Sequence, residues 1–264
     1  MNTGLDARVV LITGGSAGIG LATAKAMLSA GAVVATVSRG AGPGIGEQMH
    51  VVADLSEPGE PQRVVAEVEA SLQRIDILVN NVGLAVIRDL QDVSDDDWDL
   101  SLRTNVLSAI GATSAALPGM LKRGRGVIVN VASTAGRRPS RNLPDYSVAK
   151  AALLAYSRQV AETYSGQGIR CNAVIPGPTL TPSWTGAGGL AEQQGNRDEV
   201  LAKAAAARPL GRFAEPSEIA NVIAPVAPVS PRPRLSRRND MSVTITPPLA
   251  RAAAIGRPAR RGAA

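Results

Sequence analysis

The segment RVVLITGGSAGIGLATAKAMLSA, residues 8–30, decides the fold of this chain of 264 residues. Residues 9–12, Val-Val-Leu-Ile, are apolar without polar alternation, which predicts a strand over 8–13 that is buried on both faces. Gly14, Gly18 and Gly20 follow directly, and a helical pattern comes next. A glycine turn between a strand and a helix leaves backbone N–H groups and the positive end of the helix dipole free. The segment therefore predicts a phosphate-binding turn, although its spacing, GxxxGxG, differs from the GxGxxG fingerprint.

The rest of the chain alternates apolar runs with helical patterns. Strands are expected at residues 33–37, 49–55, 75–83, 127–131 and 169–175, and helices at 61–73, from 93 to 105 and beyond, from about 144 to 164, and from 215 to 223. This alternation predicts an α/β fold. Residues 182–212 are rich in Gly and Ala and fit a loop with a short helix, an insertion of the kind that often forms a lid.

Composition excludes several classes of function. A hydrophobic content of 45% supports one large α/β domain. No apolar run reaches eighteen residues and the first residues do not resemble a signal peptide, so we expect no membrane span and a cytoplasmic protein. The one cysteine, Cys171, and the one histidine, His50, argue against a disulfide, a metal site and a histidine-based triad.

Positive charge is concentrated at the C-terminal end. The whole chain carries +6, whereas residues 225–264 hold eight Arg, one Asp and no Lys or Glu, so the preceding 224 residues carry −1. With six aromatic residues in the chain, a base-stacking surface is not expected, and we predict no nucleic-acid partner. A basic tail that binds nucleic acid stays an alternative, and salt-dependent binding that is lost on truncation would reveal it.

A tyrosine and a lysine near the middle of the chain have the spacing of a catalytic pair. Tyr146 and Lys150 are four residues apart, so they share one helical face, and Ser133 follows the apolar run 127–131. A cation beside a phenol lowers the phenol pKa and assists proton transfer to a substrate oxygen. Such pairs also occur on ordinary helices, where the tyrosine packs and the lysine is solvated. Ser133 favours the catalytic interpretation because open α/β sheets bind ligands at strand ends.

Residues at other strand ends point to a dinucleotide. Arg39 follows the second expected strand, where an acid would recognise ribose hydroxyls and an arginine a 2′-phosphate; alternatively Arg39 is a solvated loop charge. Asp54 would accept a hydrogen bond from adenine or cap the next helix. The amides of Asn80 and Asn81 are expected to tie strand ends together. Asn105 is a poor residue for a helix interior, which indicates a tertiary role.

These motifs together resemble the short-chain dehydrogenase/reductase family, of the type that includes 3-oxoacyl carrier-protein reductases. The resemblance rests on TGGSAGIG at 13–20, NNVG at 80–83, Asn105, Ser133, YSVAK at 146–150 and PGPTLT at 176–181. The resemblance spans about residues 5–224. We therefore expect residues 1–224 to form an NAD(P)-binding catalytic domain. The resemblance implies a doubly wound parallel sheet of the Rossmann type with helices on both faces.

The resemblance also implies an activity and its residues. A hydride would pass between a nicotinamide, NADP rather than NAD, and a ketone or secondary alcohol, with Tyr146 as acid/base. Lys150 would hold the nicotinamide ribose, Ser133 the substrate oxygen, and Asn105 a water relay. Cofactor contacts are implied for Gly14, Ser16, Gly18, Ile19, Gly20, Ser38, Arg39, Asp54, Leu55, Asn81, Gly83, Tyr146, Lys150, Pro176, Gly177, Thr179 and Thr181. A homodimer or homotetramer is implied, unless the altered C-terminus disrupts it. Alternatives are an NAD-dependent secondary-alcohol dehydrogenase and a catalytically impaired nucleotide-binding protein.

The C-terminal segment departs from the family pattern. The family follows the helix near 215–224 with a last strand and a DGG-like segment, whereas residues 225–264 contain seven prolines and little periodicity. This composition predicts a disordered tail in place of the last strand, with 241–246 as the stretch that could form a strand. The abrupt change after Ala224 suggests an altered reading frame in GC-rich coding DNA. Without a last strand, the sheet would have an unpaired edge.

Overall fold

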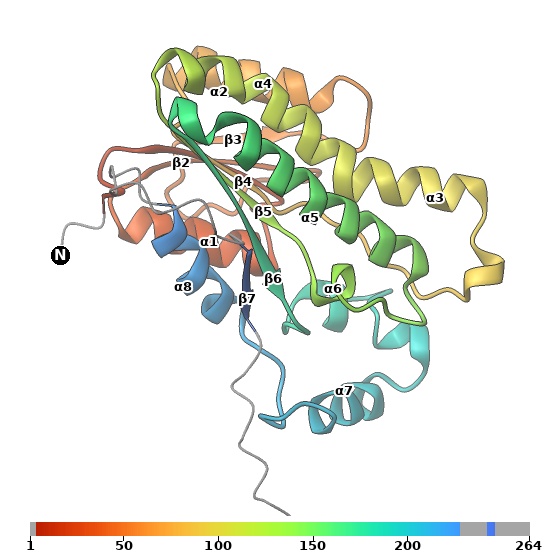
Figure 1. The fold of residues 1–264 in the computed structure, drawn as a ribbon. Helices are drawn as coiled ribbons and strands as arrows, with labels where there is room; N and C mark the ends of the chain where they lie inside the picture. Colours follow the sequence, from red (N-terminus) through yellow and green to blue (C-terminus); the bar gives the residue numbers. More distant parts are fainter. Residues whose placement is uncertain (1–3, 228–241, 246–264) are drawn as a thin grey trace, which may run out of the picture.

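The computed structural model describes residues 4–227 and 242–245 of the chain. Seven parallel strands form one sheet in the order β3-β2-β1-β4-β5-β6-β7 (Figure 1). They are β1 (Val9–Thr13), β2 (Val33–Ser38), β3 (Met49–Val52), β4 (Ile77–Asn80), β5 (Gly126–Val131), β6 (Ile169–Pro176) and β7 (Ser242–Ile245). The doubly wound sheet predicted from the sequence is confirmed. Its order reverses between β1 and β4, the position where such sheets bind ligands.

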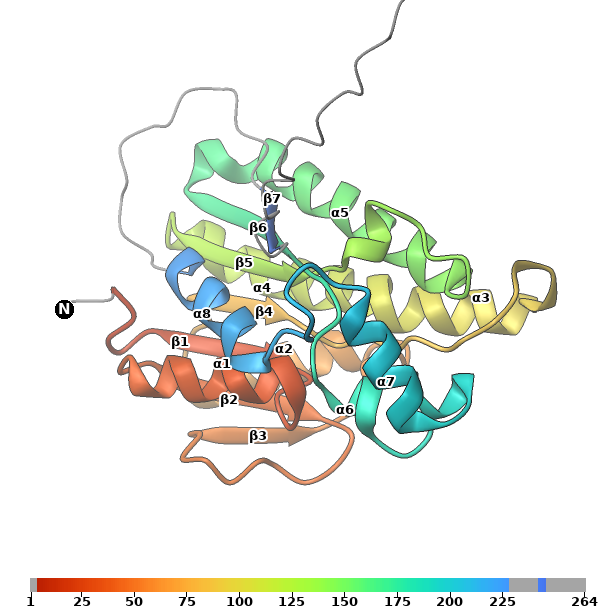
Figure 2. The same cartoon turned by 90° about the horizontal axis from the view of Figure 1, so that it is seen from below.

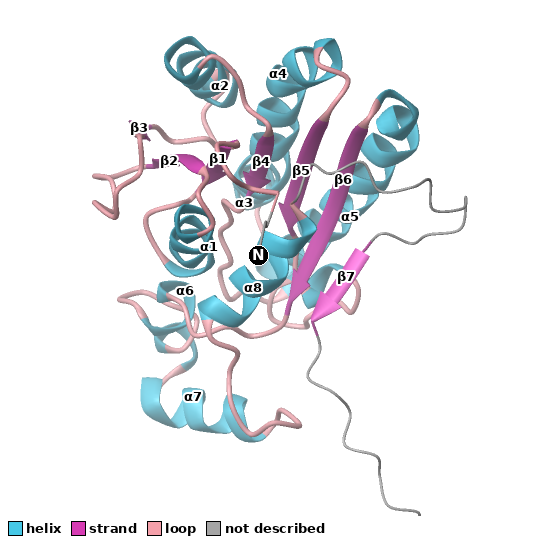
Figure 3. Ribbon diagram, turned by 90° about the vertical axis from the view of Figure 1, so that its left-hand side faces the viewer, coloured by secondary structure: helices cyan, strands magenta, loops and turns pink. Residues whose placement is uncertain are grey.

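Helices cover both faces of the sheet (Figures 1 and 3). On one face lie α2 (Glu60–Leu72), α4 (Ser108–Lys122) and α5 (Pro144–Tyr164), and on the other α1 (Gly18–Ser29) and α8 (Pro216–Val226). Neighbouring strand residues alternate between the two faces, so that Leu11 packs under α2 and α4 while Val10 and Ile12 pack against α1. The central strands β1 and β5 are buried along their whole length and are mainly apolar, as their sequences indicated.

The insertion after β6 lies beyond the carboxyl ends of the strands (Figures 2 and 3). It contains α6 (Pro182–Thr185), the single turn η5 (Glu192–Gln194) and α7 (Arg197–Ala206). Three short turns also connect the main elements: η1 (Leu90–Asp92), η3 (Thr134–Gly136) and η4 (Ser165–Gln167). The insertion therefore covers the edge of the sheet where the predicted site residues end their strands.

The long helix expected from 93 onward is interrupted. It begins as α3 (Asp95–Leu102), with a capping box between Ser94 and Asp97. It then widens into the π-helical turn η2 (Arg103–Leu107), which contains Asn105, before continuing as α4. π-Helical turns are rare in proteins, and those that occur often lie at functional sites. The poor helical propensity of Asn105 thus coincides with the irregular turn.

The C-terminal edge of the sheet differs from the prediction of an unpaired strand. β7 pairs in parallel with the last residues of β6, from Ala173↔Ser242 to Pro176↔Ile245. The stretch 241–246 had been singled out as the candidate strand, and its backbone now extends the sheet at the end nearest the cleft. The predicted domain boundary at residue 224 falls inside α8, which ends at Val226. The prediction of a disordered tail falls largely on 228–241 and 246–264, outside the described residues.

None of the helices in the described part of the chain combines the length and apolarity needed to cross a membrane.

Candidate active site

A cleft of about 1550 Å³ opens at the carboxyl ends of the strands, beneath the insertion. All but two of the predicted site residues line it. These are Gly14, Ser16, Gly18, Ile19, Ser38, Arg39, Asp54, Leu55, Asn81, Gly83, Ser133, Tyr146, Lys150, Pro176, Gly177, Thr179 and Thr181. Gly20 and Asn105 lie outside the lining. The fold therefore gathers residues from six strand ends, separated by up to 167 positions, around one space.

The glycine turn after β1 has the backbone of an anion cradle. Gly14 and Gly18 have φ angles of +65° and +52°, which residues with a Cβ rarely adopt. The cap of α1, Ala17, offers no side-chain acceptor, so the first N–H groups of the helix remain available beside the cleft. This end of the cleft therefore fits the diphosphate of a dinucleotide.

Gly20 has a structural role in the turn instead of a cleft-lining one. A Cβ on this residue would lie 2.1 Å from the Gly14 carbonyl oxygen and 2.6 Å from Nδ2 of Asn81. That Asn81 amide donates to the carbonyl oxygens of Thr13 and Gly14, at 3.0 and 3.2 Å. The expectation that Asn81 ties strand ends is borne out, and Gly20 leaves room for the tie.

Asn80 provides a second tie between strand ends. Its Nδ2 donates to Oδ1 of Asn130 on β5 at 2.8 Å and to Oγ1 of Thr113 on α4 at 3.1 Å. Asn130 in turn donates to the Ser157 hydroxyl on α5 at 2.8 Å. The buried network joins β4, β5 and two covering helices, and so fixes the floor beneath the catalytic end of the cleft.

Polar groups at the ends of β2 and β3 form the opposite end of the cleft. Oδ1 of Asp54 accepts from the backbone N–H and the hydroxyl of Ser56, at 3.0 and 2.7 Å. The pKa of Asp54 lies below its usual range, mainly because its carboxylate accepts the hydrogen bond from the Ser56 hydroxyl. The Ser56 N–H and the charge of Arg39 lower it less. Because α2 starts at Glu60 with Gly59 as its cap, Asp54 does not cap that helix. Arg39 is exposed and lines the cleft, and β2 ends without an acid.

Ser133 and Tyr146 meet at the other end of the cleft. Ser133 follows β5 and caps the short turn η3, and Tyr146 lies in the first turn of α5. The two side chains share a hydrogen bond, and burial raises the pKa of Tyr146 above its usual value. Lys150 was expected to lower the pKa of Tyr146, so the direction of this shift was predicted wrongly. The reason is that desolvation disfavours the phenolate, while the amine is directed elsewhere.

Lys150 is buried beneath the tyrosine. Its Nζ donates to the carbonyl oxygen of Val131 at 3.1 Å and lies 5.6 Å from the centre of the Tyr146 ring. Burial lowers its pKa to about 8. The side chain is 2% exposed, and its amine lies close to the backbone of Gly83, where a Cβ would approach Nζ to 3.2 Å. The shared helical face predicted from the sequence thus faces the cleft.

Asn105 stands behind Gly83 and fixes the loop that follows β4. Its Oδ1 accepts from the Leu84 N–H at 3.1 Å, and its Nδ2 donates to the Leu84 and Ser101 carbonyl oxygens at 2.9 and 3.0 Å. A Cβ at Gly83 would lie 3.1 Å from Oδ1 of Asn105. The tertiary role expected for this asparagine is therefore the attachment of the 83–84 backbone beside Lys150.

An ion-pair bridge holds the start of α5, where Tyr146 lies. Arg88 contacts Asp97 at the beginning of α3 and Asp145 at the beginning of α5. Asp145 is 3% exposed, and the Arg88 N–H also donates to the Asn142 carbonyl oxygen at 3.1 Å. The bridge connects three segments around the tyrosine, and nothing in the local sequence pattern identified it.

The insertion contributes lining residues that the sequence did not single out. They are Leu190, Gln194, Val200, Lys203, Ala204, Ala207, Arg208 and Pro209. Trp184 lines the cleft, and its ring meets Phe213 edge-on at 5.0 Å between centroids. Of the three arginines near Tyr146 in sequence, Arg138 lines the cleft, whereas Arg137 and Arg141 do not. Helical periodicity within 197–207 was the signal that could have found the α7 residues.

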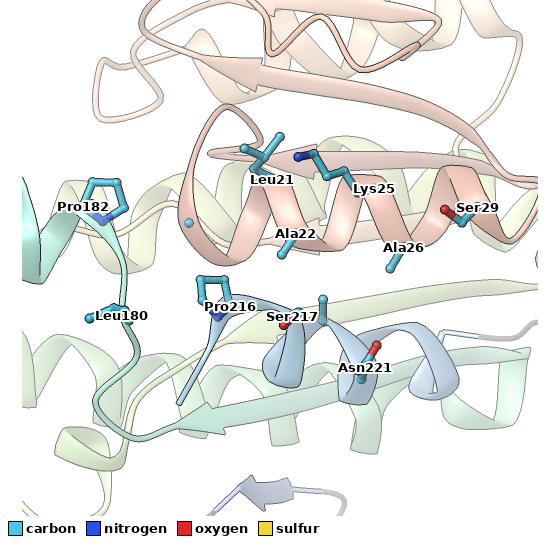
Figure 4. Close-up of a pocket in the computed structure, with 12 residues that line it drawn as sticks. Leu21, Ala22, Lys25, Ala26, Ser29, Leu180, Pro182, Pro216, Ser217 and Asn221 are labelled. Atoms are coloured by element: carbon cyan, nitrogen blue, oxygen red, sulfur yellow. The ribbon is translucent and has the colours of Figure 1, made fainter. Parts of the chain in front are cut away.

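A smaller cavity of about 550 Å³ lies between α1 and α8 (Figure 4). Ala22, Ala26 and Ala220 line it, and Lys25 is its one titratable lining residue. Neither Tyr146 nor Ser133 faces it, so it is not part of the catalytic arrangement. Within the described residues, no group of three His, Cys, Asp or Glu side chains is placed to hold a metal ion.

Replacement of Lys150 by methionine is expected to change how stability depends on pH. The folded amine has a pKa of about 8, against about 10.4 in an unfolded chain. Between these values the unfolded chain binds more protons, so the free energy of unfolding rises with pH in this window. Lys150→Met should lack that rise and be up to about 3 kcal/mol more stable at pH 7, where the wild type buries a charge.

Urea unfolding at pH 7, 8, 9 and 10 measures this difference. Lys25→Met is the control, because Lys25 is exposed on α1 and should retain the wild-type pH dependence. Parallel stability curves for the wild type and Lys150→Met would contradict the lowered pKa.

Comparisons with known proteins agree with this geometry. A model of the short chain dehydrogenase family matches residues 8–188. 2-(S)-Hydroxypropyl-CoM dehydrogenase 3 of Xanthobacter autotrophicus is 35% identical over 235 residues, covering 84% of this chain and 90% of that protein. D-beta-hydroxybutyrate dehydrogenase of Cupriavidus necator is 32% identical over 233 residues, covering 81% and 88%. The structure of L-sorbose reductase from Gluconobacter frateurii superposes with a TM-score of 0.83 at 29% identity, covering 93% and 97%.

The chain belongs to the short-chain dehydrogenase/reductase family. It is an NAD(P)-dependent oxidoreductase that acts on CH–OH groups, interconverting secondary alcohols and ketones.

Proposed function

We propose that this protein is an NADPH-dependent reductase of small ketones, with the reverse oxidation of the secondary alcohol at the same site. The observation that carries the proposal is the hydrogen-bonded pair of Ser133 and Tyr146 with the Lys150 amine buried below it, in the cleft that contains the glycine turn. When bound, NADPH supplies the hydride. The tyrosine then supplies the proton that the carbonyl oxygen requires.

Each residue of the trio has a distinct part in this proposal. Ser133 donates a hydrogen bond to the substrate oxygen and orients it toward the Tyr146 hydroxyl. Tyr146 stays protonated until transfer, because burial raises its pKa. Lys150 has a pKa of about 8, so it keeps its proton in most molecules at neutral pH and counters the negative charge left on the tyrosine. Asn105 holds the loop at Gly83 and thereby the position of the lysine.

NADPH is the proposed cofactor because β2 ends without an acid and Arg39 lines the cleft directly after it. An arginine at this place suits a 2′-phosphate, whereas an acid would suit the free ribose hydroxyls. Two similar structures contain this cofactor. They are L-sorbose reductase with NADPH and L-sorbose, 31% identical, and an NAD(P)-dependent gluconate 5-dehydrogenase from Beutenbergia cavernae with NADP at low occupancy, 30% identical. Both support the proposal. An NAD-dependent alcohol dehydrogenase is the alternative.

Replacement of Arg39 by aspartate should reverse the cofactor preference. Loss of a charge-assisted contact, worth about 1.5–3 kcal/mol, weakens NADPH binding by about ten- to a hundredfold. Binding of NADH should change far less, and the new acid can accept from the ribose hydroxyls. Fluorescence titration with both cofactors measures the ratio. Arg125→Asp is a charge-matched control, because Arg125 is exposed and directly precedes β5, at the opposite end of the strands from the cleft. Equal NADPH affinity in wild type and Arg39→Asp would refute the assignment.

The function itself is tested with a panel of ketones and secondary alcohols, followed by the absorbance of the reduced cofactor. Turnover of a ketone with NADPH is the expected result. Binding of cofactor without turnover of any substrate would favour the catalytically impaired nucleotide-binding protein. We further propose a cytoplasmic homo-oligomer that acts on a small molecule and requires no nucleic acid or membrane; light scattering of the purified protein measures its oligomeric state.

A further inference from the structure

The cleft that contains Ser133 and Tyr146 is lined by several cations and, among the described residues, by one acid. Arg138 enters this cleft from the loop between β5 and α5, Lys203 from α7, and Arg208 from the residues just after α7. Among the described residues that line the cleft, Asp54 is the one acid. It follows β3 and lies near Arg39. The cleft that holds the Ser133–Tyr146 pair therefore carries an excess of positive charge.

Helix α7 separates its charges between two faces. The positions that line the cleft are Val200, Lys203, Ala204 and Ala207, which have the i, i+3, i+4, i+7 spacing of a single helical face. The two acids of the helix, Asp198 and Glu199, stand in its first turn and do not line the cleft. Helical geometry thus directs the lysine into the cleft and keeps the carboxylates out of it.

The three cations are not neutralised by ion pairs in the part of the chain that the structure describes. Five arginines elsewhere pair with carboxylates: Arg63, Arg74, Arg88, Arg103 and Arg212. Within residues 4–227, Arg138, Lys203 and Arg208 have no such partner. Cations of one sign along a cleft with low-dielectric walls concentrate their field in it and attract an anionic ligand.

We propose that Arg138, Lys203 and Arg208 form an anion subsite, and that the substrate is a small ketone bearing a carboxylate, with the corresponding hydroxy acid as product. The inference rests on the proposed ketone reduction and specifies its substrate class. The ketone oxygen lies at Ser133 and Tyr146, and the carboxylate accepts hydrogen bonds from the two guanidinium groups and the ammonium. Trp184 and Leu190 provide the apolar wall for the carbon chain between them.

The first test compares each keto acid with its own methyl ester. The series 3-oxobutanoate, 4-oxopentanoate and 5-oxohexanoate varies the distance between ketone and carboxylate, and esterification removes only the charge. At the best chain length, kcat/KM with NADPH should be at least about tenfold higher for the acid. This preference should decline as salt rises from 0.05 to 0.5 M, because salt screens the attraction. Esters that equal or exceed their acids at every length would overturn the proposal.

The second test assigns the preference to residues. Arg138→Gln, Lys203→Gln and Arg208→Gln should each reduce the acid-to-ester ratio of kcat/KM, by about tenfold or more for the strongest contact. Arg141→Gln is the matched control: Arg141 belongs to the same loop as Arg138, is exposed, and does not line the cleft. Its acid-to-ester ratio should equal that of the wild type. A loss in Arg141→Gln as large as in Arg138→Gln would reveal a general field effect and contradict a subsite.

A binding measurement separates this inference from the proposed function. Pentanoate and methyl pentanoate, which carry no ketone, are titrated into the protein–NADPH complex by calorimetry. Tighter binding of pentanoate, weakened in Lys203→Gln and Arg208→Gln, is expected even if no ketone is reduced. Turnover of esters without any preference for acids would leave the reductase proposal standing and overturn the anion subsite. A substrate delivered by a carrier protein would instead give turnover of the acyl-carrier ketone and none of the free acids, which also overturns it.

Discussion

Replacement of Tyr146 by phenylalanine is expected to lower kcat by about 10²–10⁴-fold, the contribution of a positioned general acid. The ring remains, so the packing around Lys150 and the affinity for NADPH should stay close to wild type. The hydrogen bond with Ser133 is lost, but the serine hydroxyl still accepts from the Ala135 N–H at 3.1 Å. Steady-state kinetics with a good ketone, together with a cofactor titration, measures both quantities.

Tyr164→Phe is the control for this experiment. Tyr164 ends the same helix and packs in the core beneath α2 and α4, away from the residues that line the cleft. Its replacement should leave kcat within about twofold, because this half-buried side chain is remote from the cleft. If Tyr146→Phe retained more than a tenth of the wild-type kcat, another group would have to be the proton donor.

Replacement of Gly136 by alanine should produce the second large effect, through the position of Ser133. A Cβ on Gly136 would lie 2.7 Å from the carbonyl carbon of Lys150 and 2.8 Å from its oxygen, on the backbone of α5. Gly136 closes the turn η3 that Ser133 begins, so relief of the clash must move this turn away from the helix that carries Tyr146. A displacement of about 1 Å can reduce kcat by about 10²-fold.

Gly166→Ala is the matched control, because a Cβ there would meet nothing within 4 Å and the residue lies in η4 at the far end of α5. We expect Gly136→Ala to lose kcat while its circular dichroism spectrum and NADPH affinity remain similar to those of Gly166→Ala. Equal kcat in the two variants would show that the turn does not set the distance between Ser133 and Tyr146.

The sequence by itself determined the features that depend on local pattern. Apolar runs of five or six residues located β1 and β5, and the glycines after β1 indicated a helix whose first N–H groups face a ligand. The spacing of Tyr146 and Lys150 gave their common face, since i and i+4 always coincide on a helix. Six motifs in register then gave the family, and with it a doubly wound sheet.

Features that depend on what lies across the fold were decided only by the tertiary structure. The pKa of Tyr146 is raised because burial outweighs the hydrogen bond with Ser133, and burial is set by residues distant in sequence. Asn105 reaches the backbone of Leu84 because a π-helical turn reorients it, and Gly20 serves the turn and not the cleft. Lys203 lines the same cleft as Tyr146 because the insertion folds back over the strand ends. β7 joins β6 through backbone hydrogen bonds, which are open to any sequence that can extend, so composition alone could not decide that pairing.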